Sequence, residues 1–153
     1  MEKTNILMVC LGNICRSPLA EGVLKSMLDS QKFMVDSAGT ASYHTGDTPD
    51  RRSVEVAREN GVDISNLKAR TFSVNDFEKF DYIFVMDKSN YKNVIQLAKN
   101  EQYKAKVSFL LDELETQNQK ELPDPYYGDK SDFEKVYRDI AKACKAIAEK
   151  LSN

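Results

Sequence analysis

The sequence predicts an α/β fold in which a doubly wound parallel sheet carries helices on both faces. Short apolar runs alternate with helical patterns along the whole chain, as in successive strand–helix–strand units with right-handed crossovers. The chain has 153 residues, 41% of them hydrophobic, which allows one core and is too short for two ordinary domains. We therefore expect one domain over residues 1–153, with ligands bound beyond the carboxyl ends of its strands.

The first predicted strand covers residues 5–10, an apolar run without a helical stripe. A helix should follow directly, with Ser17 as its N-cap and Pro18 at the first helical position, where no backbone N–H is required. Apolar residues then recur at helical spacing over residues 19–28. The chain therefore passes from strand to helix within residues 11–17.

The rest of the chain continues this alternation. The remaining predicted strands are residues 33–37, 82–86 and 106–110. The remaining predicted helices are residues 53–60, 89–99 and 131–151, together with a short helix that Ser73 and Asp76 open as a capping box. Gly61 suits the left-handed position that ends the helix before it. The sequence thus predicts about four parallel strands in one sheet.

The charge pattern excludes several classes of partner. Lys and Arg number 22 against 24 Asp and Glu, and the formal net charge is -2, so no basic field is expected to attract nucleic acid or an anionic membrane. No apolar stretch approaches the roughly 20 residues that cross a bilayer, and the first residues do not resemble a signal peptide. We expect a cytoplasmic protein without a nucleic-acid or membrane partner.

The cysteine pattern argues against disulfides and against a metal site. Three cysteines form an odd set in a chain large enough to fold without crosslinks. Cys10 and Cys15 lack the second pair of ligands that zinc needs, and the single histidine, His44, is a loop residue to which we assign no role. Cys144 lies on the apolar stripe of the last helix and is expected in the core. The sequence predicts no metal and no cofactor.

The segment between the first strand and the first helix is the predicted anion site. Unpaired N–H groups and the positive end of a helix dipole meet there. Gly12 lets the backbone curl inward, Asn13 tolerates the left-handed conformation, and the Arg16 guanidinium can hold two phosphate oxygens at once. We call this segment the phosphate cradle, and its residues are Leu11, Gly12, Asn13, Ile14, Cys15, Arg16 and Ser17.

Cys10 stands at the mouth of the phosphate cradle and is the candidate nucleophile. Helix N-termini and arginine favour the ionised form of a thiol, so we expect a thiolate at neutral pH. A thiolate below a phosphate held by Arg16 can attack phosphorus in line and form phosphocysteine without a metal. Ser17 can donate its hydroxyl to the sulfur. A cysteine six residues before an arginine is a weak motif alone, and the strand before it and the helix after it support the interpretation.

Other polar side chains have two interpretations each. Asp124 is the candidate general acid, which would protonate the leaving group and later activate water, although Asp-Pro before Tyr-Tyr-Gly is also an ordinary turn. Asp87 is expected to cap or brace neighbouring loops rather than to act chemically, because one carboxylate suffices for the mechanism. Arg51 and Arg52 indicate a solvated helix start, with recruitment of acidic peptides as the lesser alternative. Cys15 either captures oxidised Cys10 as a disulfide or is a packing residue.

Four stretches of the chain resemble the low-molecular-weight protein tyrosine phosphatases. They are VCLGNICRS at residues 9–17, DSAGT at 36–40, FDYIFVMDKSN at 80–90 and DPYYG at 124–128. The resemblance implies a small flavodoxin-like sheet of four parallel strands. It also implies the nucleophile Cys10, the phosphate-clamping Arg16, the general acid Asp124, and aromatic walls around a phosphotyrosine ring at Tyr43, Tyr126 and Tyr127.

One position departs from that family. Many members carry a histidine three residues before the arginine matched by Arg70, where it bonds the asparagine of the cradle. This chain has Leu67 at that position. Asn13 must then rely on Ser37 or on backbone groups.

The sequence therefore predicts a phosphatase that acts on phosphotyrosine in proteins and peptides and also binds inorganic phosphate and similar oxyanions. One alternative is a phosphoarginine phosphatase of the same fold, although the two tyrosines after Asp124 favour an aromatic substrate. A second is an arsenate reductase of this fold, which would need two further cysteines that residues 64–118 lack. A third is a phosphoryl carrier, in which Arg16 and Asp124 would release the phosphoryl group too readily.

Overall fold

The computed structural model describes residues 2–114 and 120–152, and within them four parallel strands form one sheet in the order β2-β1-β3-β4. The strands are β1 (Thr4–Cys10), β2 (Phe33–Gly39), β3 (Tyr82–Val85) and β4 (Val107–Phe109). Each coincides with a predicted strand apart from small shifts at its ends. The predicted parallel α/β architecture is therefore confirmed.

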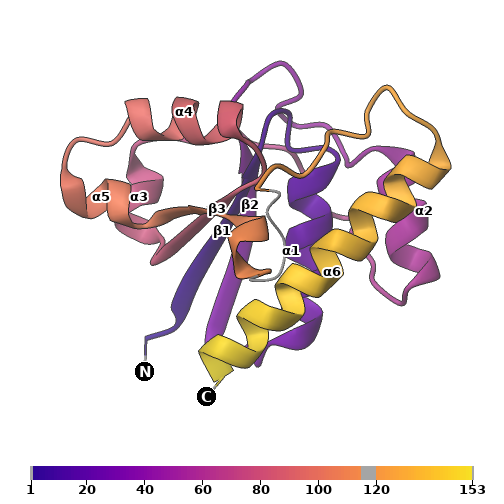
Figure 1. Cartoon of the computed structure of the whole chain (residues 1–153), viewed down its shortest axis with the longest axis horizontal. Helices are drawn as coiled ribbons and strands as arrows, with labels where there is room; N and C mark the ends of the chain where they lie inside the picture. Colours follow the sequence, from indigo (N-terminus) through magenta and orange to yellow (C-terminus); the bar gives the residue numbers. More distant parts are fainter. Residues whose placement is uncertain (1, 115–119, 153) are drawn as a thin grey trace.

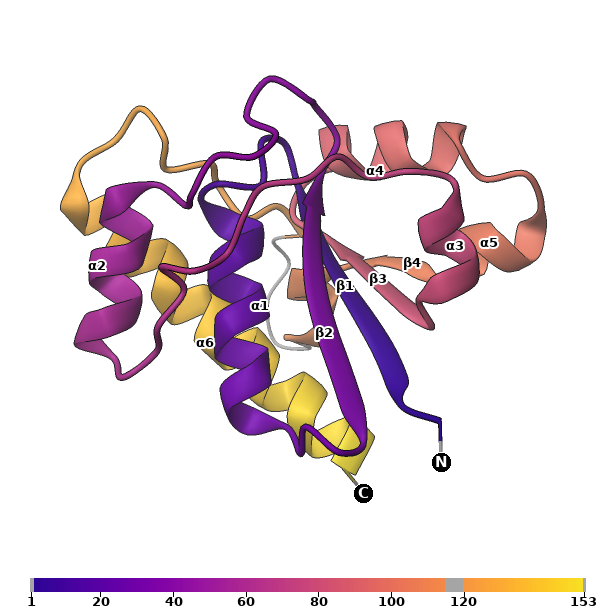
Figure 2. The same cartoon turned by 180° about the vertical axis from the view of Figure 1, so that it is seen from behind.

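Helices cover both faces of the sheet (Figures 1 and 2). One face is covered by α1 (Arg16–Met27) and α6 (Lys130–Ser152), and α2 (Arg51–Glu59) packs against these two helices. The other side carries α3 (Asn75–Lys79), α4 (Lys88–Gln96) and α5 (Glu101–Ala105). No helix of the described residues has both the length and the apolar character required to cross a bilayer.

The side chains of β1 alternate between two hydrophobic cores. Ile6, Met8 and Cys10 belong to the core beneath α1 and α6, whereas Leu7 and Val9 belong to the core of the opposite face. This period of two is the expected geometry of a strand that is buried on both faces. Because Cys10 is the last residue of β1, its side chain lies on the α1 face, at the edge where the parallel strands end.

Several local predictions were wrong. The helix α1 begins at Arg16 after the N-cap residue Cys15, so Ser17 lies inside the first turn and is not the cap. Its hydroxyl is used elsewhere, by Asn13 and Cys10. The predicted helix 89–99 ends early at Gln96. The short helix α5 and the 3₁₀ helix η1 (Leu110–Glu113) were not predicted.

The turn prediction for Gly61 is confirmed, and the predicted capping box forms in part. Gly61 follows α2 with a φ of 79°, the left-handed conformation in which glycine is favoured. At the start of α3 the carboxylate of Asp76 accepts from the Ser73 N–H at 2.9 Å, which is the reciprocal half of the predicted capping box. The N-cap residue of that helix is Val74, so the box is shifted by one residue from its usual place.

Candidate active site

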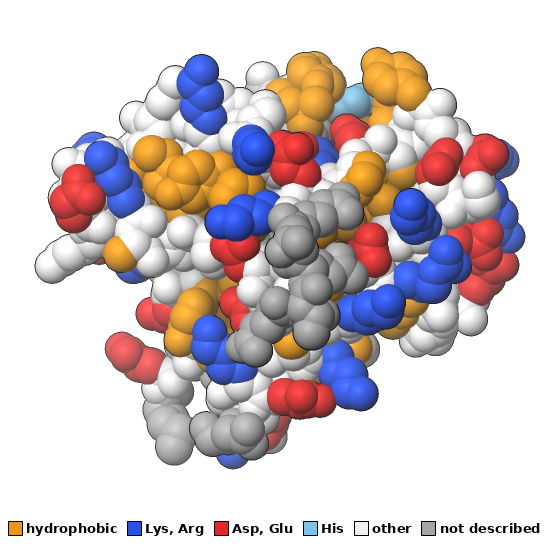
Figure 3. Space-filling model, viewed as in Figure 1, with side chains coloured by type: hydrophobic (Ala, Val, Ile, Leu, Met, Phe, Trp, Pro, Cys, Tyr) orange, Lys and Arg blue, Asp and Glu red, His pale blue; other side chains and the backbone are white. Residues whose placement is uncertain are grey.

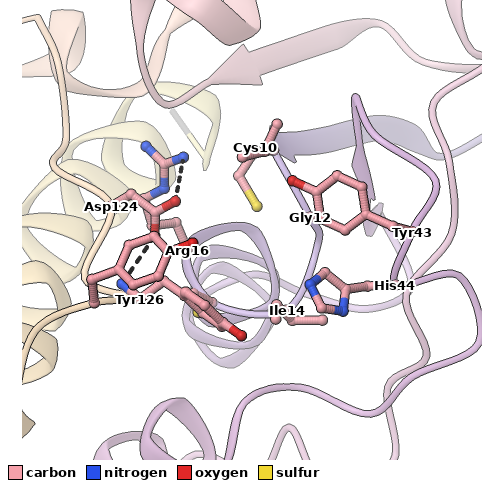
Figure 4. Close-up of a pocket in the computed structure, with 11 residues that line it drawn as sticks. Cys10, Gly12, Ile14, Arg16, Tyr43, His44, Asp124 and Tyr126 are labelled. Carbon is pink, nitrogen blue, oxygen red and sulfur yellow. Dashed lines mark hydrogen bonds and ion pairs between the residues drawn. The ribbon is translucent and has the colours of Figure 1, made fainter.

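A pocket of about 260 Å³ opens at the carboxyl end of β1, where the phosphate cradle leads into α1 (Figure 4). Its lining residues are Cys10, Leu11, Gly12, Ile14, Cys15, Arg16, Tyr43, His44, Asp124, Tyr126 and Tyr127. The predicted nucleophile, arginine, acid and three aromatic walls therefore surround one pocket. Asn13 and Ser17 of the cradle are buried and bond the Cys10 sulfur.

The backbone of the phosphate cradle turns at the two residues that the sequence indicated. Asn13 has a φ of 57°, the left-handed conformation. Gly12 lies against the ring of His44, and an added Cβ there would come within 3.0 Å of the ring. No side chain caps the start of α1, so the first amides of the helix stay available to an anion in the pocket.

The Cys10 sulfur is held by two donors of the phosphate cradle. The Ser17 Oγ lies 3.0 Å from it, and the Asn13 backbone N–H donates to it at 3.3 Å. Cys10 is only 2% exposed, so water cannot replace these partners freely. Hydrogen bonds that point at a sulfur, together with a helix N-terminus, favour the charged form of a thiol.

A buried hydrogen-bond chain fixes the direction of these bonds. The Glu21 carboxylate can only accept, so the Ser37 hydroxyl donates to its Oε1 at 2.6 Å. The Ser37 oxygen then accepts from the Asn13 Nδ2 at 2.9 Å, and the same Nδ2 donates to Ser17 at 2.7 Å. Because Ser17 already accepts from Asn13, its own proton is left to point at Cys10.

The other end of the Asn13 amide confirms the expected replacement for the missing histidine. Its Oδ1 accepts from the Arg70 backbone N–H at 3.0 Å, and its Nδ2 bonds Ser37. Both predicted substitutes, Ser37 and a backbone group, are therefore in use. Leu67 instead packs against the hydrophobic core below α1.

Arg16 is buried, with 2% of its surface exposed, and is fixed through one nitrogen. Its Nη1 donates to the Asp87 Oδ2 and to the Leu122 carbonyl, both at 2.8 Å. Burial acts to lower the pKa of Arg16, but the charge of Cys10, the hydrogen bond to Asp87 and the charge of Asp124 outweigh it and raise that pKa. Arg16 therefore stays a cation that faces the pocket with its remaining donors.

Asp87 connects two elements, as the sequence predicted. Its Oδ1 accepts from the Asn90 N–H at 2.8 Å and caps α4, while its Oδ2 holds Arg16. Both oxygens are thereby used in bracing the site. This carboxylate lies two residues after the end of β3 and comes from the same edge of the sheet as Cys10.

Asp124 lies at the rim of the pocket, in a segment that we call the acid loop, residues 123–128. Its side chain is 39% exposed, and its Oδ2 is 3.7 Å from the Arg16 Nη2. Its Oδ1 accepts from the Tyr126 N–H at 3.1 Å. The carboxylate thus faces the pocket from the side opposite Tyr43 (Figure 4), where it can reach a group bound above Cys10.

Aromatic side chains form the upper walls of the pocket. Tyr43 is 67% exposed and meets His44 edge to face, with ring centroids 4.9 Å apart. Tyr126 and Tyr127 form a second edge-to-face pair at 4.9 Å. In the space-filling view hydrophobic side chains flank the pale-blue histidine at this edge of the molecule (Figure 3). Such walls suit an aromatic ring carried by the phosphate.

The sequence does not indicate the position of His44 in the pocket, and it indicates only part of the role of Arg52. His44 lines the pocket between Tyr43 and Tyr126, and its Nδ1 lies 3.1 Å from the Asp47 Oδ2. Its position beside Tyr43 in sequence was the available signal. Arg51 is solvated, as predicted, with 87% of its side chain exposed, but Arg52 bonds two carbonyls of the acid loop.

The other two cysteines lie in packed surroundings. Cys15 is free, 4% exposed, and packs with Val56 and Phe133. Burial, and after it the charge of Asp50, raise its pKa above the ordinary value of a thiol. Cys144 is fully buried in the core, which confirms its predicted packing role. Packing is therefore confirmed for Cys15, while its capture of oxidised Cys10 stays a prediction.

Comparisons with known proteins agree along almost the whole chain. The family model described as low molecular weight phosphotyrosine protein phosphatase matches residues 5–153. A human low molecular weight phosphotyrosine protein phosphatase is 40% identical over 151 residues, which cover 95% of this chain and 94% of the human one.

Two solved structures extend the similarity to the fold. The protein tyrosine phosphatase from Entamoeba histolytica with Hepes in its active site has a TM-score of 0.92 and 40% identity, with 98% of this chain and 97% of that chain covered. Wzb from Vibrio vulnificus in complex with benzylphosphonate has a TM-score of 0.87 and 33% identity, covering 97% of this chain and 99% of its own.

Proposed function

The chain belongs to the low molecular weight phosphotyrosine protein phosphatase family, and on this premise we propose that it hydrolyses phosphotyrosine in proteins through a phosphocysteine intermediate. Cys10 is the nucleophile, Arg16 and the amides of the phosphate cradle bind the phosphoryl oxygens, and Asp124 is the acid and then the base. The whole chain, residues 1–153, acts as one catalytic domain.

The observation that carries the proposal is the environment of the Cys10 sulfur. It lies below the amides of the phosphate cradle, accepts from Asn13, and is next to the hydroxyl of Ser17. Arg16 and Asp124 border the same pocket. A nucleophile, an anion site and a proton donor are thus combined at one place, as transfer of a phosphoryl group to sulfur requires.

In the first step the Cys10 thiolate attacks phosphorus opposite the leaving oxygen, and the S–P bond forms as the P–O bond to the phenol breaks. Asp124, in its protonated form, gives its proton to that oxygen, so the product leaves as neutral tyrosine. The negative charge on the three equatorial oxygens is stabilised by Arg16 and by the cradle amides, which are already oriented before the substrate arrives.

In the second step water attacks the phosphocysteine. The Asp124 carboxylate takes a proton from that water, and the S–P bond breaks to release inorganic phosphate and the thiolate. The Ser17 hydroxyl, directed at the sulfur by Asn13, stabilises the departing thiolate. Apart from that water, every catalytic group in this scheme is a side chain or a backbone amide of the chain itself.

The preference for phosphotyrosine rests on the walls of the pocket. Tyr43 and Tyr126 face each other across the opening and can hold a phenyl ring above Cys10 (Figure 4). A neighbour of the same fold is solved with benzylphosphonate, an aromatic ring on a phosphorus oxyanion. The expected partners are phosphotyrosine proteins and peptides, with phosphate and related oxyanions as inhibitors. The three unpaired cysteines support a cytoplasmic location.

The test is hydrolysis of a phosphotyrosine peptide by the wild type, Cys10→Ser and Asp124→Ala. We expect the wild type to turn over in the presence of a chelator and to be inhibited by vanadate, Cys10→Ser to be inactive, and Asp124→Ala to be slow with a flattened pH profile. Turnover by Cys10→Ser would exclude the phosphocysteine route. Faster turnover of phosphoarginine, or arsenate reduction coupled to thioredoxin, would favour the corresponding alternative enzyme.

A further inference from the structure

Arg52, in the first turn of α2, connects Asp50 with the acid loop. Its side chain is 28% exposed. The Nε and Nη2 groups donate to the two carboxylate oxygens of Asp50, each at 3.0 Å. The other bonds reach the acid loop, where Nη1 donates to the Gly128 carbonyl and Nη2 to the Tyr126 carbonyl, each at 2.9 Å. One edge of the planar guanidinium therefore bonds Asp50, and the other bonds the acid loop.

The contact with Tyr126 bears directly on Asp124. The N–H of Tyr126 donates to the Asp124 Oδ1 at 3.1 Å, and the C=O of the same residue accepts from Arg52. The turn is closed by the Gly128 N–H, which donates to the Pro125 carbonyl at 2.8 Å. Arg52 thus fixes the backbone whose amide orients the carboxylate of Asp124.

The opposite end of this connection is the phosphate cradle. The Asp50 N–H donates to the Ile14 carbonyl at 2.7 Å, and the Asp50 side chain caps α2 by accepting from the Arg52 N–H at 2.8 Å. The guanidinium also lies over the Phe133 ring, 4.3 Å from its centroid. A continuous set of bonds therefore runs from the cradle through Asp50 and Arg52 to the acid loop.

The pair of Asp50 and Arg52 stays charged in this setting. Burial acts to raise the pKa of Asp50, but the hydrogen bonds from Arg52 and its charge lower that pKa below the ordinary aspartate value. The hydrogen bonds to Asp50 in turn raise the pKa of Arg52. The connection is thus ionic as well as geometric, and an uncharged side chain of similar length cannot reproduce it.

We infer that Arg52 is a positioning residue for proton transfer, because it sets the distance between Asp124 and the phosphate bound in the cradle. The inference rests on the proposed role of Asp124 as general acid. A general acid must lie within hydrogen-bond reach of the leaving oxygen, and a displacement of about 1 Å can cost about 10²-fold in rate. Arg52 touches neither the substrate nor Cys10 in this scheme and acts only through the acid loop.

The test compares two substrates that differ in their need for a proton. Phenyl phosphate has a basic leaving group, whereas the leaving group of 2,4-dinitrophenyl phosphate departs without protonation. We expect Arg52→Met to lower kcat/KM for phenyl phosphate about tenfold or more and to change it less than about twofold for the dinitrophenyl ester. Arg52→Lys should fall between, because lysine restores the charge without the fork.

Arg51→Met is the matched control. It removes the same charge one position away, where the side chain is 87% exposed and only 3.7 Å from Glu55 in a surface pair. Both kcat/KM values should stay at the wild-type level. The melting temperature and the affinity for vanadate are measured for each variant, and if Arg52→Met does not fold, the substrate ratio of Arg52→Lys decides.

The double variant Arg52→Met/Asp124→Asn separates the possible failures. Once the acid is absent, loss of Arg52 should not change the ratio of the two substrates any further. Equal losses on both esters, or a further change of ratio in the double variant, would overturn the positioning role. If Asp124→Asn alone leaves the ratio at the wild-type value, the acid assignment fails, and the inference fails with it.

Discussion

The phosphate cradle and the acid loop border the same pocket but are built in different ways. In the cradle Asn13, Arg16 and Ser17 are 3%, 2% and 0% exposed, and they make hydrogen bonds to buried or partly buried groups around them. In the acid loop Tyr126 is 37% and Tyr127 96% exposed. The acid loop is open to solvent, and its backbone is held by the partly exposed side chain of Arg52.

This difference matches what each side of the pocket has to recognise. The phosphoryl group is identical in every substrate, so fixed, buried donors can bind it without reorganisation. The leaving group varies with the protein substrate, and the side that meets it is open. Changes in the cradle should therefore weaken the binding of every oxyanion, whereas changes in the acid loop should affect proton transfer and the binding of the aromatic leaving group.

The largest loss of activity is expected from Gly39→Ala, because a side chain at the end of β2 would displace the backbone of the cradle. Gly39 pairs with Cys10 across β1 and β2. An added Cβ would lie 2.7 Å from the Leu11 carbonyl oxygen and 3.1 Å from the Asn13 nitrogen, and backbone atoms cannot rotate away. Because several amides would shift together, we expect kcat/KM to fall about 10³-fold. Vanadate affinity, measured as an inhibition constant, should fall as well.

Gly61→Ala is the control for this change. It adds the same methyl group at a φ of 79°, where no atom lies within 4 Å. Stability should decrease because alanine is strained in the left-handed region, and kcat/KM should not change. A Gly39→Ala enzyme that is inactive yet binds vanadate like the wild type would contradict the proposed role of the cradle.

The second largest loss of activity is expected from a change in the acid loop alone. Asp124→Asn keeps the size of the side chain and an oxygen for the Tyr126 N–H, but it cannot give up a proton. We expect kcat/KM for a phosphotyrosine peptide to fall about 10²-fold, the range of a lost general acid. Inhibition by inorganic phosphate should stay unchanged, since the cradle is intact. A parallel loss of phosphate affinity would show that the two sides of the pocket are not separable.

A third, smaller loss of activity should follow from Glu21→Gln, although Glu21 does not line the pocket. The buried carboxylate of Glu21 accepts from Ser37 and directs the chain of donors that ends at Cys10. A glutamine amide can donate to Ser37 instead, which turns that hydroxyl around. Loss of one charge-assisted bond of about 1.5 kcal/mol corresponds to about tenfold in kcat/KM.

Alkylation of Cys10 by iodoacetate at neutral pH measures this effect directly, and it should slow together with kcat/KM. Lys25→Met is the control, because Lys25 is 49% exposed and bonds the outer oxygen of Glu21. It should change the rate less than Glu21→Gln does. An unchanged alkylation rate in Glu21→Gln would show that the direction of these hydrogen bonds does not affect the reactivity of the Cys10 sulfur.

The sequence predicts the strand, the cradle and the first helix well because their signals are local. An apolar run, a glycine and an asparagine in a turn, and a helical stripe follow one another within residues 5–28. Ser17 was misassigned for a physical reason. A serine before a helix usually caps it, but here the tertiary contacts with Asn13 and Cys10 use the hydroxyl.

The missed roles depend on distant parts of the chain. Arg52 bonds carbonyls that are 74 and 76 residues away, and nothing in the sequence near Arg52 indicates the acid loop. His44 acquires its place because Gly12 has no side chain to occupy it. Helix α5 has five residues, too few to show a periodic pattern. Long-range contacts and very short elements are thus the limit of prediction here.

The smallest predicted effect tests the ionic connection between the two sides of the pocket. Asp50→Asn keeps an oxygen that can cap α2, and it removes the charge and the second acceptor oxygen that face Arg52. Because the side chain of Asp50 is 13% exposed and that of Arg52 28%, the pair is only partly screened by solvent. We expect a loss of about 1 kcal/mol, or about 2 to 4 °C in melting temperature, at neutral pH.

The pH dependence of this loss distinguishes charge from shape. The pKa of Asp50 is lowered in the folded protein, because the bonds and charge of Arg52 outweigh the opposing effect of burial. Its stabilisation is therefore complete above about pH 3.9, the ordinary aspartate value, and disappears as pH falls through the lower folded pKa. Melting temperatures of the wild type and Asp50→Asn should converge in that acidic range. If the difference persists at full protonation, asparagine disturbs the packing of α2, and the acid loop is connected to the cradle by shape and not by charge.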